Sequence, residues 1–255
     1  MGVKVGLTEV LLSDIHFPYV DWGVYKTVVK LMKIIQPDII FLNGDIVDFY
    51  PISTFNRNPQ RLNSLQEELD IAKSEIKKLR DLFPQAIMYY RMGNHEFRLQ
   101  RYLWNKAPEL AGLRSLDLTG RDQLDLYNMK IVNATGGEGR KAFKIGKLYH
   151  IHGDEIKAGA VYTAKTVFTR TRTNTIAGHW HRAQYYLDRD MQGNDRGSWL
   201  NPCLCKMSVE YDVFPNWQHG FSVIHYTQQG HFHVEQVVFS NRRILFNGKE
   251  YIAGR

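Results

Sequence analysis

Thiols and long apolar runs are both scarce in this chain. Its two cysteines, Cys203 and Cys205, lie one residue apart, which excludes a disulfide framework and is typical of a reducing compartment. No apolar run approaches the roughly 18 residues that span a bilayer, and the N-terminal residues lack the pattern of a secretory signal. We therefore expect a soluble, cytoplasmic protein without a membrane partner; the sequence does not indicate its oligomeric state.

The remaining composition is that of a folded protein. Of the 255 residues, 44% are apolar and 23% are charged, which excludes a disordered or collagen-like chain. Single hydrophobic cores stop growing near this length, so we expect one domain over residues 1–255. Basic residues outnumber acidic ones by 33 to 26, and the net charge of +7 favours a polyanionic partner.

The first half of the chain alternates between two kinds of hydrophobic pattern. Short apolar runs predict strands over Glu9–Ser13, Asp38–Leu42 and Gln85–Tyr90. Apolar residues at helical spacing predict helices over Trp22–Ile35 and Leu65–Leu82. This alternation of strand and helix favours βαβ units with parallel strand pairing.

The second half is richer in short strands. Turn signals such as Gln229-Gly230 and Asn247-Gly248 separate several of them and favour antiparallel pairs in a second sheet. The strands are expected over Leu148–His152, Thr175–Gly178, Ser198–Leu204, Gly220–Tyr226, His231–Phe239 and Arg243–Phe246. The whole pattern predicts a mixed α/β fold with two sheets.

Residues that bind metals follow five of the predicted strands, where ligands of an open α/β sheet gather. Carboxylate, amide and imidazole groups without thiolate suit Mn, Fe, Co or Zn. Seven such groups exceed the needs of one ion but match two ions that share a carboxylate, which is a common device for phosphoryl transfer. The seven are Asp14, His16, Asp45, Asn94, His152, His179 and His181.

The motifs around these residues resemble those of the calcineurin-like metallophosphoesterase superfamily. In chain order they read SDIH, NGDIVD, GNHE, HG and GHWH, and the resemblance covers roughly residues 10–185. It implies an α/β fold in which two mixed β-sheets pack as a sandwich flanked by helices, in four layers (αββα). Residues 186–255 would complete the second sheet. The chain departs from the usual pattern at Trp180, where Thr is usual, and at Glu96, where Asp is often found.

The resemblance also implies a role for each residue of the set. Two divalent ions are expected, with Mn favoured and Fe, Zn, Co or Ni as alternatives. The first ion would be bound by Asp14, His16 and His181, and the second by Asn94, His152 and His179. Asp45 would bridge the two ions. His95 would contact the scissile phosphate and protonate the leaving group, while a hydroxide held between the ions attacks phosphorus.

The expected activity is hydrolysis of a phosphoester. The net charge and the basic segment Lys157–Arg172 favour a phosphodiester of DNA, RNA or a nucleotide, although that segment is equally well read as a solvated face. The alternatives are a phosphomonoesterase, including a protein phosphatase, or a non-catalytic interaction module on the same scaffold. The C-terminal sequence over 198–226 is similar to phage- and prophage-encoded members of the family.

A few other residues allow two interpretations. Asp48 either orients a metal ligand or caps the following segment, and Arg98 either reaches a substrate phosphate or pairs with a helix neighbour. His150 is expected to be a packed histidine, and the two cysteines are expected to be ordinary buried thiols. A strand's polar face is the expected place of His231, His233 and Glu235.

Overall fold

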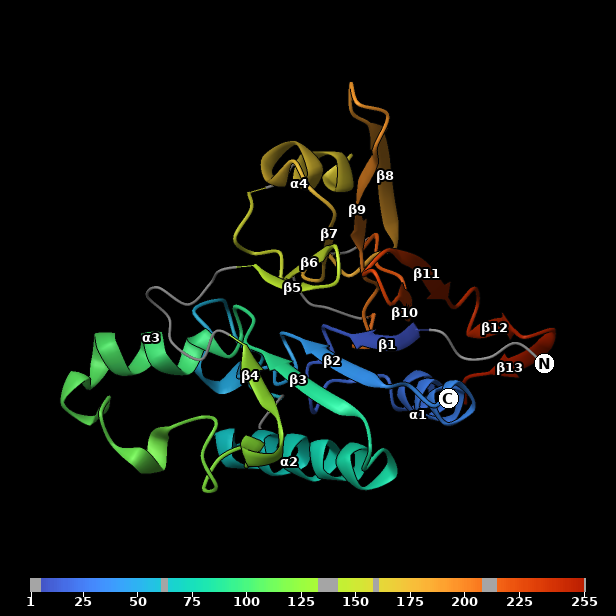
Figure 1. The fold of residues 1–255 in the computed structure, drawn as a ribbon. Coiled ribbons are helices and arrows are strands. Elements are labelled where there is room, and N and C mark those ends of the chain that lie inside the picture. Colours follow the sequence, from blue (N-terminus) through green and yellow to red (C-terminus); the bar gives the residue numbers. More distant parts are fainter. Residues whose placement is uncertain (1–5, 61–63, 133–141, 158–160, 208–214, 255) are drawn as a thin grey trace.

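The two predicted sheets are present in the computed structural model, which describes residues 6–60, 64–132, 142–157, 161–207 and 215–254. A six-stranded sheet has the order β11-β10-β1-β2-β3-β4, and a five-stranded sheet has the order β5-β6-β7-β9-β8. Both contain parallel and antiparallel pairs. They lie face to face with helices outside them (Figure 1), which confirms the predicted α/β sandwich.

The six-stranded sheet combines the two halves of the chain. Its parallel strands are β1 (Gly6–Leu12), β2 (Ile39–Asn43), β3 (Ile87–Arg91) and β4 (Lys130–Val132). The antiparallel strands β10 (Gly220–Thr227) and β11 (Phe232–Val238) extend it beyond β1. Because β1 to β3 are parallel, their carboxyl ends meet at one edge of this sheet.

The five-stranded sheet carries the remaining site strands. It consists of β5 (Phe143–Ile145), β6 (Leu148–Ile151), β7 (Thr175–Ala177), β9 (Asp195–Leu200) and β8 (Gln184–Arg189). The sequence analysis assigned all of 186–255 to this sheet, but only β8 and β9 join it. Strands β10 and β11 cover the free edge of β1 in the other sheet, and the hairpin of β12 (Arg243–Phe246) and β13 (Lys249–Ile252) pairs only with itself among the described residues.

Helices form the outer layers. Helices α1 (Trp22–Ile35) and α2 (Leu65–Leu82) have the predicted bounds and lie on the outer side of the six-stranded sheet (Figure 1). Asp21 caps α1, and a capping box begins α2. Helix α4 (Thr163–Thr171) packs on β8 and β9, and α3 (Phe97–Lys106) leads away from the site. None of the described helices is long and apolar enough to cross a membrane.

Apolar side chains from both sheets fill the layer between them, including Leu11, Phe41 and Ile176. Three polar side chains, Glu9, His150 and Tyr226, form a hydrogen-bonded cluster within this layer. His150 Nε2 lies 2.9 Å from Glu9 Oε1, and the hydroxyl of Tyr226 donates to Glu9 Oε2 at 2.8 Å. His150 is therefore a packed histidine, as expected, and it links β6 to β1 across the two sheets.

Candidate metal centre

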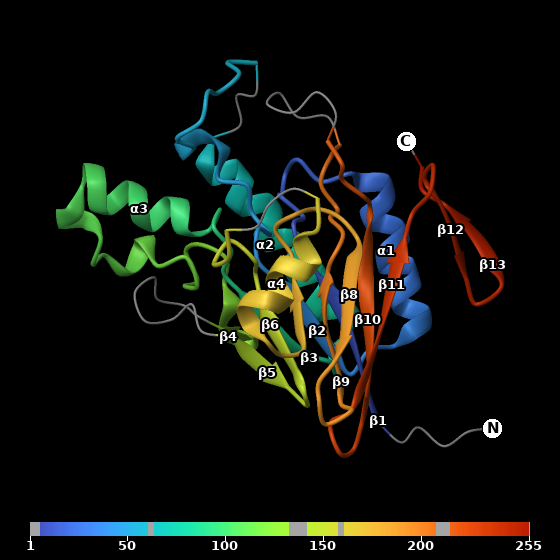
Figure 2. The same cartoon turned by 90° about the horizontal axis from the view of Figure 1, so that it is seen from above.

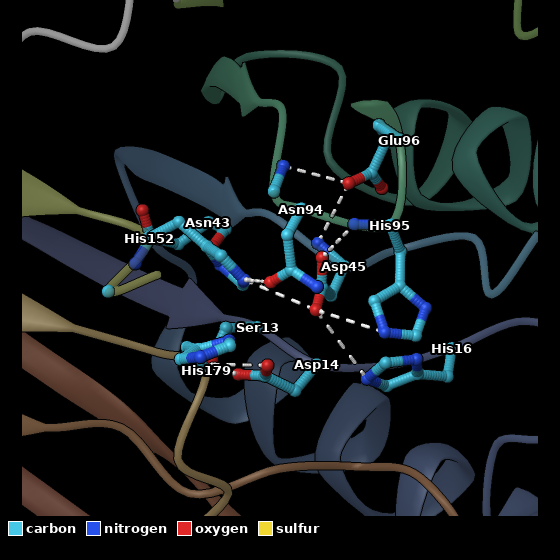
Figure 3. Close-up of polar contacts among 12 residues, drawn as sticks. Ser13, Asp14, His16, Asn43, Asp45, Asn94, His95, Glu96, His152 and His179 are labelled. Atoms are coloured by element: carbon cyan, nitrogen blue, oxygen red, sulfur yellow. Dashed lines mark hydrogen bonds and ion pairs between the residues drawn. The ribbon is translucent and has the colours of Figure 1, made fainter. Parts of the chain in front are cut away.

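The residues predicted to bind metal converge from five strands. Figure 3 shows side chains from the ends of β1, β2, β3, β6 and β7 directed into one small volume. Among the described residues, three triplets have one ligand atom each within 4.8 Å of one another. The triplets are His16–His181–Cys205, His16–Asp45–His95 and Asp45–His152–His179. Because His16 and Asp45 each occur twice, the triplets form one continuous cluster.

The backbone is strained where these side chains turn inward. Asp14, His16, Asp45, His179 and His181 all have positive φ, between 53° and 69°. Residues with a Cβ adopt this left-handed region only at a cost, and such residues concentrate at functional sites. Five of the seven predicted ligands therefore occupy conformations that ordinary strand ends do not require.

Glycines allow the strand ends to approach one another. Gly44 has φ of +88°, and a Cβ at this position would collide with the ring of His152. A Cβ on Gly93 would collide with the carboxylate and backbone of Asp45. Close packing of the turns thus requires glycine beside Asp45 and Asn94.

The first predicted ligand group lies together on one side of the cluster. Nε2 of His181 is 3.2 Å from Asp14 Oδ1, and Nε2 of His16 is 3.4 Å from Nε2 of His181. The backbone N–H of His179 donates to both carboxylate oxygens of Asp14 at 3.0 Å. All three members of the group are buried.

The second predicted group lies beside Asp45. Nε2 of His152 is 3.2 Å from Asn94 Oδ1 and 3.2 Å from Asp45 Oδ2. His179 joins Asp45 and His152 in a triplet. Asp45 Oδ2 also lies 4.0 Å from Nε2 of His16, a member of the first group. This carboxylate is therefore positioned between the two groups.

Hydrogen bonds at Nδ1 of His152 and His16 direct the Nε2 atoms of both rings toward the cluster. Nδ1 of His152 donates to the carbonyl of Asn43 at 2.8 Å, and Nδ1 of His16 donates to the Asp48 carboxylate at 2.8 Å. In the neutral imidazoles, both Nε2 atoms then point as acceptors at other acceptors. Such an arrangement is repulsive unless a proton or a cation lies among the atoms. The donor set and its orientation fit divalent metal ions.

The charges within the cluster shift its pKa values strongly. Burial alone would raise the pKa of Asp45, but His152 and His95 hold it well below its usual range. Burial alone would lower the pKa of His181, but Asp14 raises it to about 9. His152 behaves similarly: Asp45 overcomes burial and holds its pKa well above the usual range. Without metal, protons therefore occupy atoms that face the predicted ions.

His95 lies at the edge of the cluster and is linked to Asp48 and Arg98. Its Nδ1 donates to the Asp48 carbonyl at 2.7 Å, and its Nε2 is 3.0 Å from Arg98 Nη2. Arg98 Nη1 also donates to the Asp48 carbonyl at 3.1 Å. Asp48 therefore orients both His16 and His95, which supports the first of its two interpretations. Arg98 contacts a site residue rather than a helix neighbour of opposite charge.

The sequence analysis assigned no contact to Glu96, yet this residue holds two loops of the site together. Its carboxylate accepts from the backbone N–H groups of Asp45, Ile46 and Gly93 at 3.0, 2.8 and 2.8 Å. The Val47 N–H and the Tyr90 hydroxyl donate to it as well. The available signal was its place next to His95 in the GNHE motif.

Cys205 is closer to the site than expected. Its sulfur lies 3.8 Å from Nδ1 of His181, and both cysteines are buried free thiols. Burial and the neighbouring Cys203 raise the pKa of Cys205 well above its ordinary value. Cys205 contacts the Nδ1 atom of His181, whereas the Nε2 atom of His181 faces Asp14 at 3.2 Å, so the carboxylate, amide and imidazole groups remain the candidate ligand set.

The structure thus combines a two-sheet sandwich with an Asp/His/Asn cluster at the ends of its strands. The chain belongs to the calcineurin-like phosphoesterase family, whose model matches residues 10–233. The family assignment confirms the resemblance inferred from the motifs.

The individual proteins and structures that resemble this chain share low sequence identity with it. The Gene 54 protein of Mycobacterium phage D29 is 25% identical over 232 residues, which cover 84% of this chain and 87% of the phage protein. A UDP-glucose:protein N-beta-glucosyltransferase of Actinobacillus pleuropneumoniae serotype 5b is 32% identical over 103 residues; the match covers 40% of this chain but only 15% of that protein. Among solved structures, Vacuolar Protein Sorting 29 from Cryptosporidium parvum has a TM-score of 0.47 at 12% identity, with 98% and 96% of the two chains covered. The phosphoesterase Yfce from E. coli has a TM-score of 0.37 at 11% identity, with 92% and 100% covered.

Proposed function

We propose that this protein is a phosphoester hydrolase that uses two divalent ions and acts on phosphodiester bonds of nucleic acids or nucleotides in the cytoplasm. Asp14, His16 and His181 would hold the first ion, Asn94, His152 and His179 would hold the second, and both would share Asp45. Manganese is the favoured metal, and both sheets contribute to one catalytic domain.

The position of Asp45 is the observation that carries this proposal. Its Oδ2 atom lies 3.2 Å from Nε2 of His152 and 4.0 Å from Nε2 of His16. Its Oδ1 atom accepts from the backbone N–H of His95 at 2.9 Å, which fixes the orientation of the carboxylate. One carboxylate thus contacts residues of both ligand groups, which a single-ion site does not require.

The chain's own residues prepare the site for an anionic substrate. When bound, the two ions supply Lewis-acid stabilisation of charge on the phosphoryl oxygens. His95 is held by Asp48 at Nδ1, so its Nε2 faces Arg98 and Asp45, from which it is 3.0 and 3.7 Å away. Nε2 is therefore the ring nitrogen that would deliver a proton to the leaving oxygen, and it carries this proton only in the imidazolium form. Burial alone would lower the pKa of His95, but Asp45 raises it and so favours that form.

A metal-resolved substrate panel tests the proposal. With manganese, we expect faster hydrolysis of bis-p-nitrophenyl phosphate than of p-nitrophenyl phosphate, and loss of both activities in Asp45→Asn. An exposed residue such as Asp81 provides the matched control, because Asp81→Asn leaves the cluster untouched. Undiminished activity of Asp45→Asn would contradict the mechanism, and faster hydrolysis of the monoester would contradict the assigned substrate class.

A further inference from the structure

Helix α3 carries a row of alternating cationic and aromatic residues that is half-buried at Arg98, beside the site, and exposed at Tyr102 and Lys106. Arg98, Tyr102 and Lys106 are four residues apart, so they follow one another along one face of the helix. Arg98 Nη2 lies 3.0 Å from His95 Nε2. At about 1.5 Å per residue, the row extends about 12 Å from the site.

A second exposed aromatic residue, Trp104, lies on the opposite flank of the helix, about 160° around the axis from Tyr102. Trp104 is three residues after Arg101 and is therefore its neighbour on the helix surface. The exposed fractions of Trp104 and Tyr102 are 53% and 46%, so much of each ring faces solvent. Arg101 is anchored to the site end of the helix, since its Nη2 donates to the Asn94 carbonyl at 2.7 Å.

The charge of this helix is of one sign. Its ten residues include Arg98, Arg101 and Lys106 but no acidic residue. Its apolar side chains Phe97, Leu99 and Leu103 are buried in the core. The exposed part therefore offers cations and two aromatic rings without an apolar stripe of the kind that binds a membrane surface.

We propose that the solvent side of α3 binds single-stranded nucleic acid next to the scissile bond, with Trp104 and Tyr102 on its two flanks, Arg101 and Arg98 between them, and Lys106 at its far end. Phosphates of the strand contact the cations, and unpaired bases stack on the two rings, a combination typical of single-strand binding. A duplex satisfies only the phosphate contacts, because its bases are already stacked and paired. Figure 1 and Figure 2 show α3 directed outward from the sheets in two perpendicular views, where a nucleic-acid strand can reach it.

This inference rests on the proposed nucleic-acid substrate but is tested without hydrolysis. The probe is a fluorescein-labelled oligothymidine of about 12 nucleotides, within the range that single-strand-binding proteins cover. Its anisotropy is titrated with the protein in EDTA, so no cleavage occurs. We expect Trp104→Ala to weaken binding about 5- to 100-fold and Trp104→Phe to restore most of it.

The contributions of the cations and of the aromatic rings to oligonucleotide binding are tested with separate variants. Lys106→Gln is expected to reduce the slope of log K against log salt concentration by about 0.7, the value for one phosphate contact to a single strand. Tyr185→Ala removes a ring on β8 that is 62% exposed, more than either ring of α3, and Lys33→Gln removes an exposed cation on α1. Neither control is expected to change binding. Thermal unfolding of each variant shows whether it is folded.

Three results would overturn the assignment: unchanged affinity of Trp104→Ala, equal loss of affinity in Tyr185→Ala, or a duplex bound as tightly as the single strand. Binding of phosphatidylserine vesicles in place of the oligonucleotide would assign the face to a membrane instead. Hydrolysis of bis-p-nitrophenyl phosphate by the wild-type protein separates the two proposals. Hydrolysis without oligonucleotide binding rejects only the role of α3, and binding without hydrolysis rejects only the proposed function.

Discussion

Replacement of Glu96 by glutamine is expected to destabilise the protein strongly, although Glu96 is not a predicted metal ligand. The side chain is 2% exposed. One carboxylate oxygen accepts from Ile46 N–H, Val47 N–H and the Tyr90 hydroxyl, and the other accepts from Asp45 N–H and Gly93 N–H. In either orientation, the amide NH2 of glutamine faces at least two donors that have lost their acceptor.

The expected magnitude follows from these contacts. A buried donor without a partner costs about 1–3 kcal/mol, so two of them lower the free energy of unfolding by about 2–6 kcal/mol. Metal affinity is expected to fall as well, because the Asp45 turn depends on the same hydrogen bonds. Urea unfolding in EDTA measures the first effect, and calorimetric titration with manganese measures the second.

A glutamate in solvent provides the control for this substitution. Glu109 is exposed, so Glu109→Gln is expected to change the free energy of unfolding by less than about 0.5 kcal/mol. A loss below about 1 kcal/mol in Glu96→Gln, with unchanged manganese affinity, would refute the view that this carboxylate holds the two site loops together.

Three further predictions concern catalysis, pH and metal removal. His95→Ala is expected to lower kcat about 10²- to 10⁴-fold while the bound-metal count stays the same, as steady-state kinetics and metal analysis would show. Because Asp14 raises the pKa of His181 to about 9 in the metal-free protein, metal binding must displace this proton. Apparent manganese affinity in calorimetry should therefore rise with pH, by up to about tenfold per pH unit for each displaced proton. The part of this rise that is due to His181 should stop above about pH 9, where the ring is already neutral. A manganese affinity that does not change with pH would contradict the assignment of His181 as a ligand. Chelation should abolish hydrolysis and lower the thermal unfolding midpoint, and manganese should restore both; activity that persists in EDTA would argue against a metal hydrolase.

Sequence patterns predicted the elements whose signals are local. Helices α1 and α2 have the expected bounds because their apolar stripes coincide with clear caps. Helix α3 received no predicted bounds because it spans only ten residues and begins without a side-chain cap. The placement of β10 and β11 depends on which sheet edge they cover, and this long-range choice leaves no local pattern.

The convergence of the candidate ligands was also predictable, because parallel strands bring their carboxyl ends to one edge. All seven predicted ligands and His95 lie in or beside the cluster. Hydrogen bonds to backbone groups could not be inferred from residue types. The contacts of Glu96 with the Asp45 turn and of Arg98 with the Asp48 carbonyl belong to this class.

The central claim is that residues from five strands hold two cations around one shared carboxylate. Anomalous diffraction from crystals grown with manganese tests it most directly. The account predicts two peaks about 3.5–4 Å apart, each within bonding distance of Asp45 and of its own set of imidazoles. A single peak, or manganese bound away from Asp45, would contradict it.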